Sequence, residues 1–199
     1  MTLPTLSSDF LAALAQVDSA IAAAVQKTGC PACGGPLYQS NYQRKGRGGG
    51  LVAVDASLML RHSLCCGREG CRKRTLPPSL RFFGRRVYLT SVILFASAWA
   101  RVCATLQEAS ARTAVPPGTL GQWRRWWVES APGTDWWRGV RARMVPPPDE
   151  ASLPLSLLER LRSWAPDDTA LAWLAGRTLA PGSTRARIDV AAVLSGFPA

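Results

Sequence analysis

Apolar residues recur at helical spacing near the start of the chain and predict a first helix over residues 8–27. Successive apolar residues are three or four positions apart, which keeps them on one face of a helix. Ser7 or Ser8 can cap the N-terminus of this helix, and Gly29 is placed to end it. The apolar residues of the face are Phe10, Leu14, Val17, Ile21 and Val25.

From Cys30 to about Gly50, Gly, Pro and polar residues replace the helical pattern. Two short, irregular strands are expected, Leu37–Lys45 and Leu51–Leu64, on either side of a glycine-rich turn at 46–50. The pattern indicates a small β ribbon that is too short to bury a core of its own.

Helical patterns return in the second half of the chain. A helix is predicted over 85–103, and its apolar run Val87–Ala100 is shorter than the roughly 20 residues of a membrane span. Two short helices separated by the turn at 115–118 should follow. After the prolines at 146–148, two more short helices are expected, Leu155–Trp164 and Thr169–Leu179.

Together these elements predict a mainly α protein with a small β ribbon, organised in five parts. These are an N-terminal amphipathic helix (1–29), a ribbon (30–78), a three-helix domain (79–143), a Pro-rich linker (144–150) and a short helical C-terminal tail (151–199). The N-terminal residues lack the basic stretch of a secretory signal. We therefore expect a cytoplasmic protein without membrane contact.

Basic residues are concentrated in the middle of the chain. The whole chain has 24 Lys and Arg against 13 Asp and Glu, whereas residues 44–143 alone have eighteen basic and five acidic residues. Such localised charge favours an anionic partner, nucleic acid above all. Most of the basic residues are Arg, whose guanidinium suits phosphate and guanine edges. A GC-rich genome would also raise the Arg content, but it would not cluster the charge.

Four of the six cysteines have the spacing of a zinc site. The segment CPACGG at 30–35 is a tight turn whose glycines let backbone N–H groups point at the sulfurs. Because four sulfurs complete a tetrahedral Zn²⁺ site, a second pair is needed, and the glycine-containing C-x4-C segment at 66–71 supplies it best. We expect one structural Zn²⁺ that replaces the missing core of the ribbon. Its ligands would be Cys30, Cys33, Cys66 and Cys71.

The cysteine pattern leaves some alternatives open. Cys65 could replace Cys66 as a ligand, because adjacent residues of a strand point to opposite faces. His62 could be a ligand if the register differs, and Cys103 is expected to be a small buried residue. A redox CxxC pair is disfavoured, because Gly-Gly-Pro rather than a helix follows Cys33.

The segment 105–130 has the pattern of a helix-turn-helix. Thr105 and Glu108 form a capping box at the start of its first helix, and Val115 can fill the turn. The apolar face of the second helix consists of Leu120, Trp123 and Trp127.

Two groups of residues are candidate DNA contacts. The first lies on the remaining surface of the second helix, which would enter the major groove. The second is a basic run without acidic residues between the ribbon and the three helices, which would bind phosphates. The candidates are Thr119, Gln122, Arg124 and Arg125 on the helix, and Arg72, Lys73, Arg74, Arg81, Arg85 and Arg86 in the basic run.

The segments CPACGG, YQSNYQRKGRG, SLCCGREGCRKR and TLGQWRRWW together resemble the zinc-ribbon/helix-turn-helix DNA-binding regions of bacterial insertion-sequence transposases and their small accessory proteins. The resemblance covers about residues 30–130. It implies that the four cysteines hold zinc and that Gln122, Arg124 and Arg125 contact DNA. Such transposases also carry an acidic nuclease domain, and the 56 residues after Arg143 are too short for one. The resemblance therefore implies an accessory or regulatory protein without strand-transfer activity.

We expect a non-enzymatic protein that binds double-stranded DNA at the nucleoid, either as a transposition accessory or as a transcriptional regulator. The scattered carboxylates Asp55, Asp135 and Glu150 give no support for a nuclease triad, so no catalytic residue is assigned.

Two alternatives stay open. One is an adaptor that recruits a transposase or polymerase through the tail or the N-terminal helix, which could also pair with a second copy in a homodimer. The other is an RNA-binding ribbon whose aromatic residues stack on unpaired bases, namely Tyr38, Tyr42, Phe82 and Phe83.

Overall fold

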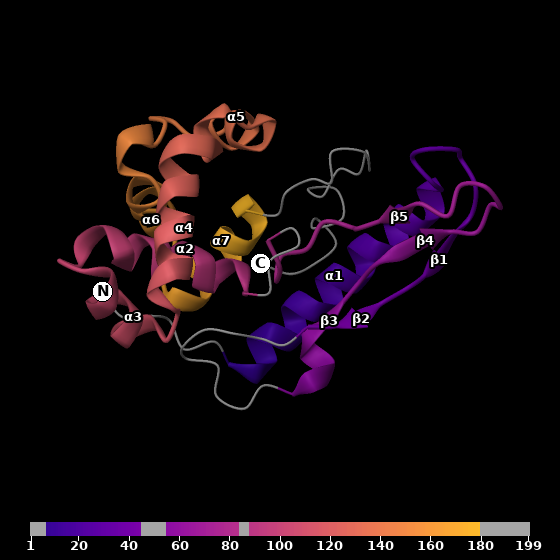
Figure 1. The fold of residues 1–199 in the computed structure, drawn as a ribbon, viewed down its shortest axis with the longest axis horizontal. Coiled ribbons are helices and arrows are strands. Elements are labelled where there is room, and N and C mark those ends of the chain that lie inside the picture. Colours follow the sequence, from indigo (N-terminus) through magenta and orange to yellow (C-terminus); the bar gives the residue numbers. More distant parts are fainter. Residues whose placement is uncertain (1–6, 45–54, 84–87, 180–199) are drawn as a thin grey trace. The chain divides into compact units, whose positions relative to one another are not determined.

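The computed structural model describes residues 7–44, 55–83 and 88–179, and this part of the chain forms two compact units (Figure 1). The ribbon unit contains residues 7–44 and 55–83, and the helical unit contains residues 88–178. The predicted N-terminal helix and ribbon thus fold together. Residues 79–83, which the sequence placed at the start of the three-helix domain, belong to the ribbon unit.

Helix α1 (Ser8–Thr28) follows the capping signals of the sequence. The Ser7 hydroxyl accepts a hydrogen bond from the backbone N–H of Phe10 at 3.2 Å. Gly29 ends the helix with φ of +77°, a conformation that glycine adopts readily. The predicted first helix is confirmed, although Leu11 rather than Phe10 is buried. The buried face consists of Leu11, Leu14, Val17, Asp18, Ile21, Ala22 and Val25.

The strands of the ribbon unit are short and form two antiparallel sheets. The first has the order β1 (Leu37–Gln39), β4 (Leu64–Cys66), β5 (Arg74–Thr75). The second pairs β2 (Tyr42–Gln43) with β3 (Leu60–Arg61). Helix α1 lies alongside these strands (Figure 1). The predicted small sheet is therefore present in shorter pieces, and its turn at 46–50 lies outside the described residues.

The two faces of the three-stranded sheet differ in burial. One face is buried and contains Leu37, Leu64, Cys66 and Thr75. The other face carries a row of residues across the three strands, in which Tyr38 pairs with Cys65 and Cys65 pairs with Arg74. Tyr38 and Arg74 are exposed. The buried face thus supplies the core of the ribbon unit.

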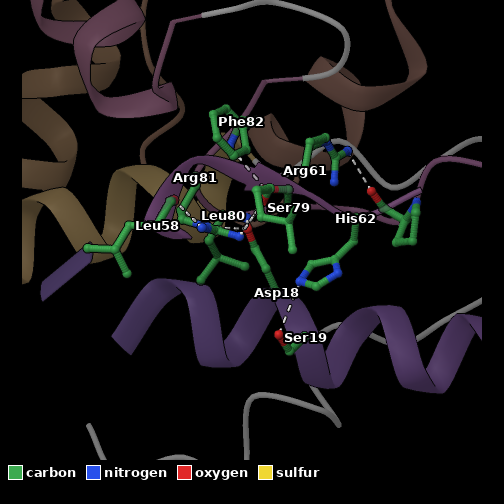
Figure 2. Close-up of polar contacts among 11 residues, drawn as sticks. Asp18, Ser19, Leu58, Arg61, His62, Ser79, Leu80, Arg81 and Phe82 are labelled. Atoms are coloured by element: carbon green, nitrogen blue, oxygen red, sulfur yellow. Dashed lines mark hydrogen bonds and ion pairs between the residues drawn. The ribbon is translucent and has the colours of Figure 1, made fainter. Parts of the chain in front are cut away.

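A buried ion pair ties α1 to the segment after β5 (Figure 2). The Asp18 carboxylate accepts hydrogen bonds from Ser79 Oγ at 2.6 Å, Leu80 N at 2.7 Å and Arg81 Nε at 2.8 Å. Arg81 also donates to backbone carbonyls of β3 and of the short 3-10 helix η1 (Ala56–Met59). Both charged side chains are 1% exposed. All the charge of this pair is therefore compensated inside the unit.

Among the described helices, α1 is long and apolar enough to cross a membrane by length and composition alone. Its apolar face is buried in the ribbon unit, and Asp18 in its middle is ion-paired with Arg81. These contacts are those of a helix in a protein core.

The helical unit contains helices α2–α7 and three short turns. The α-helices are α2 (Thr90–Val102), α3 (Leu106–Thr113), α4 (Pro117–Arg125), α5 (Asp135–Arg141), α6 (Leu155–Arg162) and α7 (Asp168–Leu179). The turns are η2 (Trp126–Ser130, π-helical), η3 (Ala131–Gly133) and η4 (Glu150–Ser152). The helices expected here are present: α2 and α6 are shorter than predicted, α7 begins one residue earlier, and α5 is an additional helix. Residues 85–87 of the predicted helix 85–103 lie outside the described residues.

Helix α2 forms the centre of this unit, and α3, α4 and α6 pack against it (Figure 1). Most of its residues are buried. The capping box of α3 forms as expected: Thr105 Oγ1 accepts from Glu108 N at 3.1 Å, and the Glu108 carboxylate accepts from Ala104 N at 3.2 Å. Val115 is fully buried in the turn before α4.

The predicted linker and much of the predicted tail are part of the helical unit. Met144 and Pro148 of the linker are buried, and the indole N–H of Trp137 donates to Glu150 at 2.8 Å. The leucines around α6 are also buried, namely Leu153, Leu157, Leu158 and Leu161. Residues 151–178 are therefore not a separable segment.

Candidate metal centre

The first cysteine pair lies in a tight turn directly after α1. The carbonyl of Cys30 accepts hydrogen bonds from the N–H groups of Cys33 at 3.3 Å and Gly34 at 2.7 Å. Gly34 has φ of +69°, which favours glycine. A Cβ on Gly35 would lie 3.2 Å and 3.3 Å from the sulfurs of Cys66 and Cys33. The glycines therefore let the backbone pass close to the sulfurs.

The second pair lies where β4 turns towards β5. The N–H of Arg68 donates to Cys66 Sγ at 3.4 Å, and the N–H of Cys71 donates to the Arg68 carbonyl at 3.2 Å. The N–H of Gly67 bonds to the Pro36 carbonyl at 2.9 Å and so joins the two turns. The sheet thus brings together two cysteine pairs that are distant in sequence.

The sulfurs of Cys30, Cys33, Cys66 and Cys71 all lie within 4.8 Å of one another. The distance from Cys30 to Cys71 is 3.8 Å, and that from Cys33 to Cys66 is 3.5 Å. A tetrahedral ion with metal–sulfur bonds of about 2.3 Å separates its ligands by about 3.8 Å. The cysteines are free thiols rather than disulfides. The cluster therefore has the donors and the size for one structural metal ion.

The protein environment favours ionisation of one thiol and opposes that of another. The backbone N–H of Gly35, followed by the Cys71 thiol, lowers the pKa of Cys33 to about 7. Burial raises the pKa of Cys66 to about 12. Since four thiolates in contact repel one another, full ionisation of the cluster needs a cation among them. The site is thus suited to a metal ion that binds as the thiols lose their protons.

The four-cysteine cluster contains Cys66 and not Cys65. Cys65 lies on the opposite face of β4, and its thiol is 3.5 Å from the Arg72 carbonyl. His62 is 3.0 Å from the Ser19 hydroxyl and is not part of the cluster. Cys103 is half-exposed rather than buried, which corrects the expectation for that residue.

Most of the predicted DNA contacts are accessible. Leu120, Trp123 and Trp127 form the buried face of α4 and η2, as expected. Thr119 is half-buried. The exposed candidates are Gln122, Arg124 and Arg125 on α4, and Arg72, Lys73 and Arg74 at the second cysteine turn.

The prediction that Arg81 contacts DNA is wrong. Its side chain is buried in the ion pair with Asp18, and its guanidinium is held by backbone carbonyls. Arg85 and Arg86, the other candidates in this part of the basic run, lie outside the described residues. Of the aromatic residues considered for stacking, Phe82 and Phe83 are buried as well.

The sequence contained one signal for the buried ion pair. Asp18 interrupts the apolar face of α1, next to Val17 and one turn before Ile21. A carboxylate at a core position requires a buried partner. Sequence spacing alone did not identify that partner, which is 63 residues away.

A second buried cation, Arg61, was also not anticipated. It donates to the Pro77 carbonyl at 2.7 Å (Figure 2), and its Nε and Nη1 atoms have no hydrogen-bond partner. Burial lowers its pKa from the ordinary value.

The candidate metal centre thus consists of four sulfurs from two turns of the ribbon unit. Three exposed basic residues directly follow its last cysteine, namely Arg72, Lys73 and Arg74. Comparisons of the chain with protein-family models, with curated proteins and with solved structures found no match.

Proposed function

We propose that this chain is a zinc-dependent protein that binds double-stranded DNA without catalysing a reaction on it. Four thiolates in a tetrahedral arrangement are a typical structural site for Zn²⁺. Because the four sulfurs fill the coordination of such an ion, no position is left for a substrate. The ion would stabilise the ribbon unit, whose strands are only two or three residues long.

The arrangement of α4 carries the proposal. Its buried face holds Leu120 and Trp123 against the unit, while Gln122 and Arg125 are exposed on the other side and Arg124 is exposed as well. A helix that is packed on one face and presents Gln and Arg on the other suits the recognition helix of a helix-turn-helix. Gln can bind adenine edges, and Arg can bind guanine edges or phosphates.

The ribbon unit would add contacts to the phosphate backbone. Arg72, Lys73 and Arg74 are consecutive, exposed and without an acidic partner in the described ion pairs. Such contacts give affinity without reading sequence. A protein of this kind fits a transposition accessory or a transcriptional regulator.

Binding to duplex DNA selected from a random pool, measured by fluorescence anisotropy across salt concentrations, tests the proposal. The logarithm of the affinity should fall linearly with the logarithm of the salt concentration. The substitutions Gln122→Ala and Arg125→Ala should weaken binding to the selected site by about 5- to 150-fold.

The matched control is Arg138→Ala, since this exposed arginine on α5 is neutralised by Asp135. It should change affinity by no more than about twofold. Absence of duplex binding at low salt would rule the proposed function out. An equal loss on selected and random DNA would restrict Gln122 and Arg125 to phosphate contacts.

A further inference from the structure

The outward face of the three-stranded sheet presents an aromatic ring beside basic side chains. Tyr38 pairs with Cys65, which pairs with Arg74, so these residues share one face across three strands. The Tyr38 side chain is 59% exposed, whereas Leu37 and Leu64 on the opposite face are buried. The Tyr38 ring is therefore accessible to a ligand on a face of the sheet that the protein itself does not cover.

The Tyr38 ring is held in place by the second cysteine turn. A Cβ on Gly67 would lie 2.2 Å from Cε2 of Tyr38, so the ring lies directly against the backbone of Gly67. Gly67 follows the cluster ligand Cys66 and bonds to the Pro36 carbonyl. The metal centre and the sheet therefore fix the ring, and little freedom is lost when a ligand stacks on it.

Two arginines lie near the Tyr42 ring of β2, and one of them, Arg74, is on this face of the three-stranded sheet. The Arg74 guanidinium lies 5.9 Å from the centre of the Tyr42 ring and donates to Ser40 Oγ at 3.2 Å. Arg44 lies 5.0 Å from the same ring and donates to the Tyr42 hydroxyl at 3.0 Å. The strand segments 37–44 and 71–75 contain no acidic residue. The face is thus complementary in charge to a polyanion with flat apolar groups.

We propose that this face binds unpaired nucleotides of single-stranded DNA, with a base stacked on Tyr38 and the neighbouring phosphates at Arg74 and the exposed Arg72. The inference rests on the proposed function, which is binding of duplex DNA by the helical unit. It adds that the ribbon unit binds single-stranded DNA. Bases in a duplex are already stacked on one another, so Tyr38 gains contact only with a base that is free. Arginine and lysine would contact phosphates of either form.

The test uses the zinc-loaded full chain and a labelled thymidine strand of about 15 nucleotides. Tyr38→Ala should weaken binding to this strand by about 5- to 150-fold and should leave duplex binding within about twofold. Tyr38→Phe keeps the ring and should bind as the wild type does. Trp164→Ala, which removes another exposed aromatic side chain in the helical unit, should change neither affinity.

An abasic strand of the same length separates stacking from charge. It keeps the phosphates but has no bases, so the wild type should bind it as weakly as Tyr38→Ala binds the thymidine strand. Zinc content and circular dichroism of Tyr38→Ala should match the wild type, because the side chain is exposed.

The inference is overturned if Tyr38→Ala has no effect, or if single strand and duplex lose affinity equally. Tighter, Tyr38-dependent binding of the matching RNA strand would overturn the assignment to DNA. Duplex binding that depends on Gln122, together with single-strand binding that Tyr38→Ala leaves unchanged, would refute this inference alone. Absence of binding to either form would refute the proposed function as well.

Discussion

Asp18 is a charged residue in the middle of an apolar helix face, and three hydrogen bonds compensate its burial. Arg81 supplies the opposite charge, while Ser79 and Leu80 complete the donors. Removal of one member of such a pair leaves the other charge buried without compensation. At the scale of single residues, this pair joins α1 to the segment after β5 inside the core.

Asp18→Ala should lower the free energy of unfolding of the ribbon unit by about 3–5 kcal/mol. Urea unfolding followed by far-UV circular dichroism measures the change. Asp135→Ala is the control, since the pair of Asp135 with Arg138 is exposed and should contribute less than about 1 kcal/mol. Equal effects of the two substitutions would contradict this role of Asp18.

His62 gives the ribbon unit a dependence on pH. Burial lowers its pKa below the ordinary value of 6.5, so the unfolded chain takes up the proton at higher pH than the folded chain does. The contribution of neutral His62 to stability is therefore complete above pH 6.5 and is lost as the pH falls through the folded-state pKa. His62→Gln should show a smaller loss of unfolding free energy below pH 6.5 in urea titrations. Identical pH profiles would exclude this contribution.

Arg81 shows what the sequence could not reveal about single residues. The basic run suggested a solvent-exposed surface, and the sequence contains no local sign that one member of the run is buried. By contrast, the contacts of Ser7 and Thr105 were predictable, because a cap bonds to a residue three positions away. Local hydrogen bonds follow from sequence, whereas contacts between distant residues depend on the fold.

At the scale of elements, the two cysteine turns determine the ribbon more than its strands do. Each turn has glycine where the backbone approaches sulfur or takes a positive φ. This pattern made the four-cysteine cluster predictable, including the choice of Cys66 over Cys65. The strands were predicted less well, because segments of two or three residues are defined by their neighbours rather than by their own pattern. Helix α5 was missed because its seven residues are too few for a clear periodicity.

Cys66→Ser should abolish zinc binding, from about one ion per chain to none, because a tetrahedral site loses one ligand. The adjacent substitution Cys65→Ser should keep the ion, since the Cys65 thiol lies on the other face of β4. Elemental analysis of the purified proteins measures the metal content. Retention of zinc by Cys66→Ser would refute the predicted ligand set.

At the scale of the whole molecule, the tryptophans lie in one unit only. All 8 tryptophans of the chain occur between residues 99 and 173, within the helical unit. The four cysteines of the metal centre belong to the ribbon unit. Tryptophan fluorescence therefore reports on the helical unit, and metal content reports on the ribbon unit.

Removal of the metal with a chelator should change the far-UV circular dichroism of α1 and the ribbon, while tryptophan emission stays as in the zinc-loaded protein. Rebinding of Zn²⁺ should restore the circular dichroism. A shift of tryptophan emission to that of the urea-unfolded chain would show instead that the helical unit also needs the metal. Unchanged circular dichroism would show that the ribbon unit does not need it.

The distance in sequence between Asp18 and Arg81 has a consequence for folding during synthesis. Helix α1 leaves the ribosome well before Arg81 does, and the first cysteine pair likewise precedes the second. The nascent helix therefore carries an unpaired carboxylate on its apolar face and half of a metal site. We expect α1 to reach its native position only after residue 81 has left the ribosome, because Asp18 has no partner for its charge before then.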